Sequence, residues 1–353
     1  MRIAKIAAFG MLALTLAAPA GAQLGSLGKK LGQAAKVVDD LTFTEAEETQ
    51  LGSEISAKLR DKYGVVQDTA VHRYVTLVGS VLAQASSRPN LKWTFIVLDT
   101  DGINAFAAPG GFVHITRGAL ALIQNEAELA DVLGHEITHV TAKHTLNAIT
   151  KSKAISTGAQ ASRSQVLSQA ADRGYEILLE NNFNRGDEVE ADKVGITLAS
   201  SAGYAPTGLG DFLTRLAERN KNLKDRSGMF ASHPETQARL DGLKKVIASS
   251  RLTSRATVSA RYAQAISYQP AALIGSGEGT TVAAPAKPSG SGKLGLGGLT
   301  RLGSEKSNDQ TVSSAGSRGV NPDRDAKGGP VKTLVAVSVT AADIAQFKAG
   351  IAG

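Results

Sequence analysis

Cysteine is absent from this chain of 353 residues, and aromatic residues make up only 5% of it. Without cysteine the protein has no disulfide bonds, no thiolate metal ligands and no N-terminal cysteine for lipid attachment. The side chains left to bind a metal are those of His, Asp and Glu, and the chain contains 6 histidines. The scarcity of aromatic residues beside 37 glycines indicates that a long part of the chain stays outside any packed core.

Long apolar segments are also missing, apart from one at the start. Arg2 and Lys5 precede an apolar stretch over residues 6–18, and small residues occupy positions 20–22. This order is typical of a cleavable signal peptide. A membrane anchor is the alternative, but the stretch is shorter than the about 20 residues that span a bilayer. We predict a signal peptide over residues 1–22, a mature protein in the periplasm or exported cell envelope without a lipid anchor, and no later transmembrane span.

The mature body lacks a strong charge of either sign. The formal net charge of +7 originates in the leader and in the residues beyond 250, which leaves residues 23–250 close to neutral. A neutral body has no electrostatic footprint for a nucleic acid, so we expect no nucleic-acid partner. The basic tail permits at most a peripheral contact with anionic lipid or another envelope surface.

The composition divides the mature chain into four parts. Residues 23–43 are rich in Gly, Leu and Lys and are expected to be flexible, whereas residues 44–250 carry the periodic patterns of a folded domain. Residues 251–330 shift to Gly, Ser, Pro and Ala, which predicts a low-complexity linker. Residues 331–353 alternate like a strand and then offer Thr340 as a helix cap, which predicts a small C-terminal strand and helix.

The folded part is mainly helical and contains a short region of strands. Residues 91–98 are β-branched and aromatic, which predicts a strand. Residues 104–108 and 112–116 flank a Pro-Gly-Gly break, which predicts two more strands in a hairpin. We therefore expect an α+β fold with a small antiparallel sheet.

One apolar-periodic run, residues 126–149, contains Gly-His-Glu-Ile-Thr-His over residues 134–139. On a helix His135 and His139 lie one turn apart on one face, where both imidazoles reach a single zinc ion. Glu136 points about 100° away from His135 around the helix axis, which suits a general base on a zinc-bound water better than a ligand. We predict one zinc ion per chain, bound by His135 and His139.

A catalytic zinc site needs a third protein ligand and keeps one position open. The densest acidic stretch downstream is Asp-Glu-Val-Glu-Ala-Asp over residues 187–192, at the start of a further helix. Acidic residues also favour a first helical turn because of the helix dipole. Charge and position alone therefore do not select one of these residues as the ligand.

Four motifs follow one another along residues 44–248. They are the strand with its Pro-Gly-Gly at 104–111, the His-Glu-x-x-His motif, Glu-Ala-Asp at 190–192, and Ser-His-Pro at 232–234 with Arg239 beyond it. This series resembles the gluzincin metallopeptidase family of HtpX, periplasmic BepA and the CAAX prenyl endopeptidases. The resemblance implies a zincin-like metalloprotease body, in a soluble, exported member of the family.

The resemblance also implies the rest of the metal site. Glu190 is implied as the third zinc ligand, and Glu188 is the less favoured alternative. Asp192 is then a group that orients a zinc-bound imidazole through the free ring N–H.

Other residues are expected near the metal. The resemblance places His233 at the zinc, where it stabilises the oxyanion or blocks the open position; otherwise it is a loop histidine. Arg239 either pairs with a ligand carboxylate or lies on the surface. His144 matches no motif, and its spacing from His139 turns it away from the metal face on a continuous helix. The predicted substrate-binding strand consists of Asn104, Ala105, Phe106 and Ala107. It is either an exposed sheet edge that holds an extended peptide or a simple packing strand.

These features predict a zinc-dependent endopeptidase that hydrolyses peptide bonds in misfolded or unassembled cell-envelope proteins. The peptidase class rests on the residues, and the substrate class rests on the resemblance. The alternative is a periplasmic chaperone or binding module for unfolded or outer-membrane proteins, with a latent zinc site that His233 caps.

Overall fold

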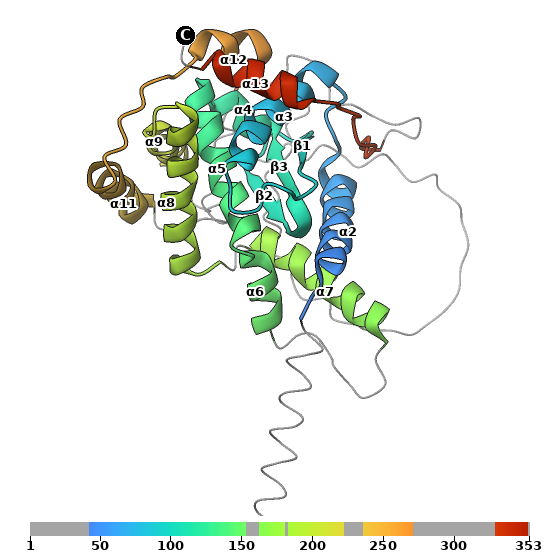
Figure 1. Cartoon of the computed structure of the whole chain (residues 1–353). Helices are drawn as coiled ribbons and strands as arrows, with labels where there is room; N and C mark the ends of the chain where they lie inside the picture. The colour runs from blue at the N-terminus through green and yellow to red at the C-terminus, as the bar shows by residue number, and fades with distance from the viewer. Residues whose placement is uncertain (1–41, 153–161, 181–182, 222–235, 271–328, 352–353) are drawn as a thin grey trace, which may run out of the picture. The chain divides into compact units, whose positions relative to one another are not determined.

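The computed structural model describes residues 42–152, 162–180, 183–221, 236–270 and 329–351 (Figure 1). From Phe43 onward the described residues belong to one structural unit. Its elements follow in the order α2 (Glu45–Tyr63), α3 (Thr69–Gln84), β1 (Thr94–Leu98), β2 (Ala105–Ala108), η1 (Pro109–Gly111), β3 (Phe112–Thr116), α4 (Arg117–Leu122), α5 (Glu126–Thr141), α6 (His144–Lys151), α7 (Arg163–Glu180), α8 (Arg185–Ala202), α9 (Gly208–Asn220), α11 (Thr236–Ser249), α12 (Ser259–Ala265) and α13 (Ala341–Ala349). None of these described helices has both the length and the apolar character needed to cross a membrane. The predicted signal peptide and most of the predicted flexible segment lie outside the described residues.

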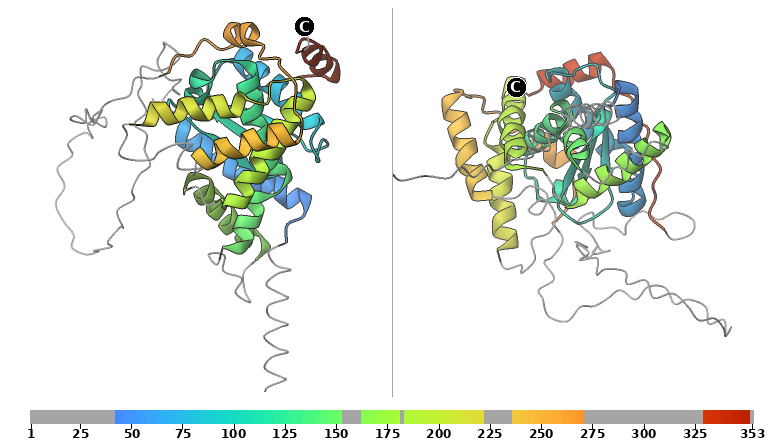
Figure 2. Two further views of the ribbon diagram at one scale, coloured as in Figure 1. Left: turned by 90° about the vertical axis from the view of Figure 1, so that its left-hand side faces the viewer. Right: turned by 90° about the horizontal axis from the view of Figure 1, so that it is seen from below.

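Helix α5 lies at the centre of this unit, between the sheet on one side and α8 on the other (Figures 1 and 2). Asn125 caps the helix, because its side chain accepts a hydrogen bond from the Glu128 amide. Every residue from Glu126 to Val140 is buried, so α5 has no solvent-facing stripe of the kind that a surface helix shows. The polar side chains of α5 consequently face other protein groups rather than bulk water.

The sheet has three strands in the order β1–β3–β2 and is mixed. β2 and β3 form the predicted antiparallel hairpin, and its turn places Gly110 and Gly111 at φ values of 71° and 97°, which glycine adopts without strain. β3 then returns between β2 and β1 and runs parallel to β1, with Thr94 opposite Phe112. The predicted α+β class is confirmed, but the prediction of an antiparallel sheet is wrong for the β1–β3 pair.

Two glycines allow α5 and α8 to cross closely. A Cβ atom on Gly134 would lie 2.6 Å from the carbonyl oxygen of Gly195, and a Cβ atom on Gly195 would lie 2.6 Å from the amide nitrogen of His135. These neighbours are backbone atoms, which cannot move aside as the end of a flexible side chain can. The crossing therefore requires glycine at both positions, and it brings the first turns of α8 close to the histidines of α5.

We expect Gly195→Ala to lower the free energy of unfolding by about 1–3 kcal/mol, because the added methyl group overpacks the α5–α8 crossing. Gly242→Ala is a matched control within α11. A Cβ atom there meets nothing within 4 Å, and alanine in a helix is more favourable than glycine by about 1 kcal/mol. Chemical denaturation of both variants measures the difference. Equal denaturation midpoints for the two variants would contradict a crossing that needs glycine.

The end of the chain packs on this unit. α13 lies beside α3 (Figure 1), and Ile344 and Ile351 join the main apolar core. The guanidinium carbon of Arg261 lies 3.9 Å from the centre of the Phe347 ring. Arg261 Nε donates a hydrogen bond to the buried carboxylate of Glu126, the first residue of α5. One arginine therefore connects the C-terminal helix to the central helix.

The structure changes two of the predicted boundaries. The linker was predicted over residues 251–330, but residues 251–270 belong to the folded unit, because they contain α12 and bury Tyr262 in the core. Residues 271–328 lie outside the described residues. Thr340 caps α13 as predicted, but the predicted strand before it is wrong. The carbonyl of Val331 accepts a hydrogen bond from the backbone amide of Val65, but the next carbonyl, that of Lys332, accepts from the side chain of Arg60 and does not continue a ladder.

Candidate metal centre

Three buried side chains converge where α5 crosses α8. The Nε2 atoms of His135 and His139 lie 3.1 Å apart. The carboxylate of Glu188 faces both rings, 3.6 Å from Nε2 of His135 and 3.4 Å from Nε2 of His139. Among the described residues these three form a group whose potential ligand atoms all lie within 4.8 Å of one another. The arrangement could therefore hold one metal ion.

The spacing of these donor atoms suits zinc. A tetrahedral zinc with ligand distances of about 2.1 Å has neighbouring ligand atoms about 3.4 Å apart, and the three measured separations lie close to that value. Two imidazoles with one carboxylate are also a donor set of catalytic zinc sites, which keep a fourth position for water or substrate. The residues present therefore fit the metal that the His-Glu-x-x-His motif predicts.

Glu190 does not belong to this group, and its prediction as the third ligand is wrong. Its side chain is 57% exposed, and its carboxylate lies 3.5 Å from Nε2 of His144. The physical reason is the helical period, since residues four apart share a face and residues two apart point about 200° away from each other. Glu188 and Asp192 share the face of α8 that meets α5, so Glu188, the less favoured alternative, is the carboxylate that faces both imidazoles.

Asp192 and Arg239 support the first imidazole from behind. An oxygen of Asp192 lies 3.0 Å from Nδ1 of His135, and the guanidinium of Arg239 donates to both Asp192 oxygens, at 2.9 Å and 2.5 Å. Burial alone would raise the pKa of Asp192, but Arg239 and the His135 ring hold it down at about 2. Asp192 is therefore a carboxylate at neutral pH, which favours the tautomer of His135 that donates from Nδ1 and leaves Nε2 for a metal.

Arg239 is a buried residue, 5% exposed, and not the surface arginine that the sequence left open. One of its terminal nitrogens also lies 3.4 Å from Glu188. Burial alone would lower the pKa of this guanidinium, but the carboxylates of Asp192, Glu188 and Glu136 raise it above its ordinary value.

His144 supports the second imidazole, a contact that the sequence did not indicate. Its Nδ1 lies 3.0 Å from Nδ1 of His139, and its Nε2 faces the carboxylates of Asp187 and Glu190. The helix predicted over residues 126–149 breaks at Lys143, which has a left-handed φ of 58°. The break starts α6 in a new direction and returns His144 to the metal face. Left-handed backbone at a lysine has no local sequence signal, because glycine or asparagine is the usual residue there.

The sequence profile of peptidase family M48 matches residues 69–247, about half of the chain. The chain belongs to peptidase family M48. The predicted metallopeptidase family is thus confirmed, and the matched residues include His135, His139 and Glu188.

Relatives of this M48 chain are similar to it over part of their length. The β-barrel assembly-enhancing protease of Yersinia pestis is 27% identical over 211 residues, which are 56% of this chain and 43% of that protein. The β-barrel assembly-enhancing protease of Escherichia coli strain K12 is 26% identical over the same shares of the two chains. The mitochondrial metalloendopeptidase OMA1 of Schizosaccharomyces pombe is 30% identical over 172 residues, 47% of this chain and 50% of that protein. The M48 chain thus spans half or less of these relatives.

The predicted substrate-binding strand is at the edge of the sheet but is not exposed. β2 pairs only with β3 among the described strands, yet Ala105, Phe106 and Ala107 are each 2% exposed or less. The ring of Phe106 stacks on Tyr63, and the carbonyl of Ala107 accepts a hydrogen bond of 2.9 Å from the hydroxyl of Thr145. The Ala107 carbonyl is therefore already bound by α6. An extended peptide could pair with this edge there only if Thr145 released that carbonyl.

Of the two predicted catalytic residues, the structure describes Glu136 but not His233. Glu136 is 1% exposed and is not among the potential ligand atoms. His233, which was predicted near the zinc, lies outside the described residues.

Proposed function

We propose that the protein is a zinc-dependent endopeptidase with His135, His139 and Glu188 as its zinc ligands. The convergence of these three buried donors at the spacing of a tetrahedral site supports the proposal. The membership of family M48 supports hydrolysis of peptide bonds as the reaction. A zinc ion held by these residues would act as a Lewis acid, which would lower the pKa of water and polarise the scissile carbonyl.

The protein's own side chains orient the two imidazoles and transfer the proton. Asp192 and Arg239 hold the ring of His135 in one tautomer, and His144 holds the ring of His139. Glu136 takes a proton from the attacking water and then delivers that proton to the departing amine, as a general base followed by a general acid. The burial of Glu136 keeps bulk water from competing for this proton.

We propose misfolded or unassembled cell-envelope proteins as the substrates and the periplasm as the place of action. The names of the relatives from Yersinia pestis and Escherichia coli, β-barrel assembly-enhancing proteases, support this substrate class. The leader over residues 1–22, which resembles a cleavable signal peptide, supports the location.

Removal of the metal tests the proposed activity. We expect the mature chain to cleave an unfolded polypeptide such as reduced casein, to lose this activity after treatment with a zinc chelator, and to recover it when zinc is added back. Zinc content is measured on the same samples. If the chain suppresses aggregation of an unfolded protein but leaves every peptide bond intact with zinc bound, it is the binding module of the alternative reading and not a peptidase.

A further inference from the structure

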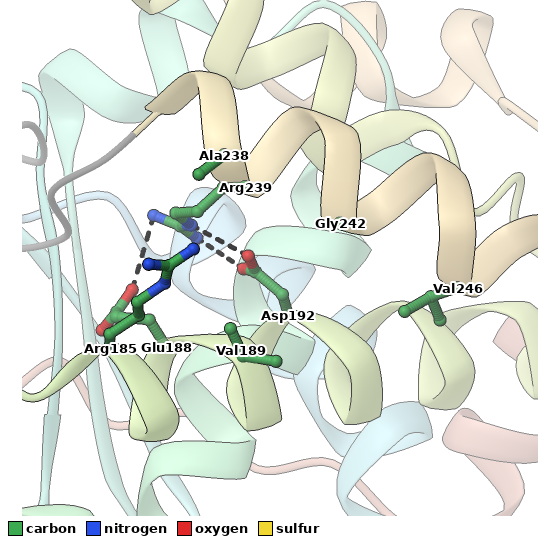
Figure 3. A pocket seen from close by; sticks show the side chains of 8 residues that line it. All are labelled: Arg185, Glu188, Val189, Asp192, Ala238, Arg239, Gly242 and Val246. Atoms are coloured by element: carbon green, nitrogen blue, oxygen red, sulfur yellow. Dashed lines mark hydrogen bonds and ion pairs between the residues drawn. The ribbon is translucent and has the colours of Figure 1, made fainter.

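The two imidazoles of the candidate metal centre are supported from different sides. Asp192 and Arg239, the ion pair that Figure 3 shows, support His135. The ring of His139 is supported by His144 instead, because the two Nδ1 atoms lie 3.0 Å apart. His144 is the first residue of α6. The direction in which α6 leaves α5 therefore decides whether this support reaches the metal site.

The change of direction occurs at Lys143, between the two helices. Its φ of 58° and ψ of 32° lie in the left-handed region, which is unfavourable for lysine and is adopted freely by glycine. The side chain of Lys143 does not cap α6. Its ammonium lies 3.3 Å from the carboxylate of Glu48 instead. The residue at the helix break is thus tied to a group outside both helices.

Glu48 is a buried carboxylate in the first turn of α2, where it is 1% exposed. Arg88 donates to both of its oxygens, at 2.6 Å and 3.1 Å, and the amide of Gly110 donates to one of them at 3.1 Å. Burial alone would raise the pKa of Glu48, but Arg88, the Gly110 amide and Lys143 lower it. Glu48 is therefore an anion at neutral pH, held in place for the ammonium of Lys143.

The same carboxylate also fixes the turn between β2 and β3. Gly110, in that turn, lies so close to α2 that a Cβ atom on it would be 2.6 Å from the α2 backbone. β2 ends just before the turn, and the carbonyl of Ala107 accepts a hydrogen bond from Thr145 of α6. The start of α6 is thus held on both sides of its histidine, by Glu48 directly and by the strand whose turn Glu48 binds.

We propose that Glu48 and Lys143 are positioning residues for the zinc site, because their ion pair holds the left-handed turn that returns His144 to His139. Glu48, Lys143 and His139 line one narrow cavity, so the ion pair lies close to the imidazole that it affects. The inference rests on the proposed zinc site and adds to it two residues that are not among the three converging donors.

The test separates the ion pair from the backbone turn at one position. Lys143→Ala removes the ammonium but keeps a Cβ atom, which disfavours the left-handed turn. We expect it to raise the Kd for zinc by about 10-fold, the lower limit for the loss of an outer partner, because His144 is no longer held. Lys143→Gly also removes the ammonium but adopts the turn freely, so it should restore most of the affinity. Competition with a coloured chelator measures the Kd of the full mature chain.

A second background shows whether the effect passes through His144. We expect His144→Ala to raise the Kd for zinc by about 10- to 100-fold, and Lys143→Ala should then add nothing further. Glu48→Gln keeps the shape of the side chain but loses its charge, and should act as Lys143→Ala does in both backgrounds. A general loss of stability would instead weaken zinc binding equally with and without His144.

Lys151→Ala is the matched control, because it removes a lysine from an exposed position in the last turn of α6. It should keep the zinc affinity of the wild type. Circular dichroism of the zinc-free proteins checks that each variant folds. If Glu48→Gln does not fold, the Lys143 variants still decide the question, since the side chain of Lys143 is 43% exposed and lies outside the packed core.

Three results would overturn the inference while the proposed function stands. A wild-type Kd in Lys143→Ala would show that the ion pair does not hold His144. An equal loss of affinity from Lys143→Ala with and without His144 would show that the effect bypasses this histidine. A Kd in Lys143→Gly as high as in Lys143→Ala would show that the turn is not what the ion pair maintains. If the wild type itself binds no zinc, the proposed function fails and the inference fails with it.

Discussion

Replacement of Glu136 by Gln is expected to lower kcat for peptide hydrolysis by about 100- to 10,000-fold, the range attributed to general acid–base catalysis. The amide keeps the shape of the carboxylate but cannot take a proton from the attacking water or return it to the leaving amine. Glu136 is 1% exposed, so bulk water has little access to replace it. The zinc content should stay that of the wild type, because Glu136 is not among the converging ligand atoms.

The experiment compares kcat, KM and zinc content of the wild type and Glu136→Gln on an unfolded polypeptide labelled for continuous fluorescence. Glu136→Asp serves as the matched variant, since it keeps a carboxylate that is displaced by one methylene group. We expect it to retain more activity than Glu136→Gln. Activity of Glu136→Gln within about tenfold of the wild type at equal zinc content would show that proton transfer does not depend on this side chain.

Loss of Glu188 should weaken zinc binding severely, whereas loss of Glu190 should not. Glu188 faces both imidazole nitrogens at 3.6 Å and 3.4 Å, and it supplies the only carboxylate of the three-donor group among the described residues. We expect Glu188→Ala to raise the Kd for zinc by more than about 100-fold, since even the loss of an outer partner raises it by about 10- to 100-fold. Peptide hydrolysis should disappear with the metal.

Glu190→Ala is the matched control on the same helical turn. Its side chain is 57% exposed, and among the described residues its carboxylate forms an ion pair with the outer nitrogen of His144 alone, so we expect a zinc affinity within about tenfold of the wild type, the lower limit for the loss of an outer partner. Competition with a coloured chelator gives the Kd of each variant, and circular dichroism checks that both fold. Full zinc binding by Glu188→Ala together with loss of zinc from Glu190→Ala would restore Glu190 as the ligand.

Helix α5 and its two histidines could be predicted from the sequence because the His-Glu-x-x-His motif is local. The spacing of His135 and His139 places both imidazoles on one face of any α-helix. The third ligand was predicted wrongly although its signal is also local. Once Asp192 is taken as the partner of His135, the residue one helical turn earlier on the same face is Glu188, and Glu190 faces the opposite way. The density of acidic residues singled out the segment 187–192, and the resemblance to the family then selected Glu190 from it without regard to the phase of the helix.

Other features of the site depend on long-range structure and leave no local pattern. His144 reaches His139 only because the chain turns at Lys143. The parallel pairing of β1 with β3 follows from strand order, and the alternation of side chains is the same in parallel and antiparallel strands. The burial of β2 results from elements distant in the sequence, such as α2, which supplies Tyr63, and α6, which supplies Thr145. Sequence pattern therefore predicted the strands themselves but not their surroundings.

The docking of α13 affects how the protein reaches its final form during synthesis. The chain is made from the N-terminus, so α5 and α8 are complete while residues 329–351 have yet to be added. Until then, α13 does not cover the core residues that contact Ile344 and Ile351. It also does not cover Arg261, which binds Glu126. Residues 271–328 also have to be made first, at about 5–20 residues per second. The final packing around the first turn of α5 therefore forms only after residues 329–351 have been synthesised.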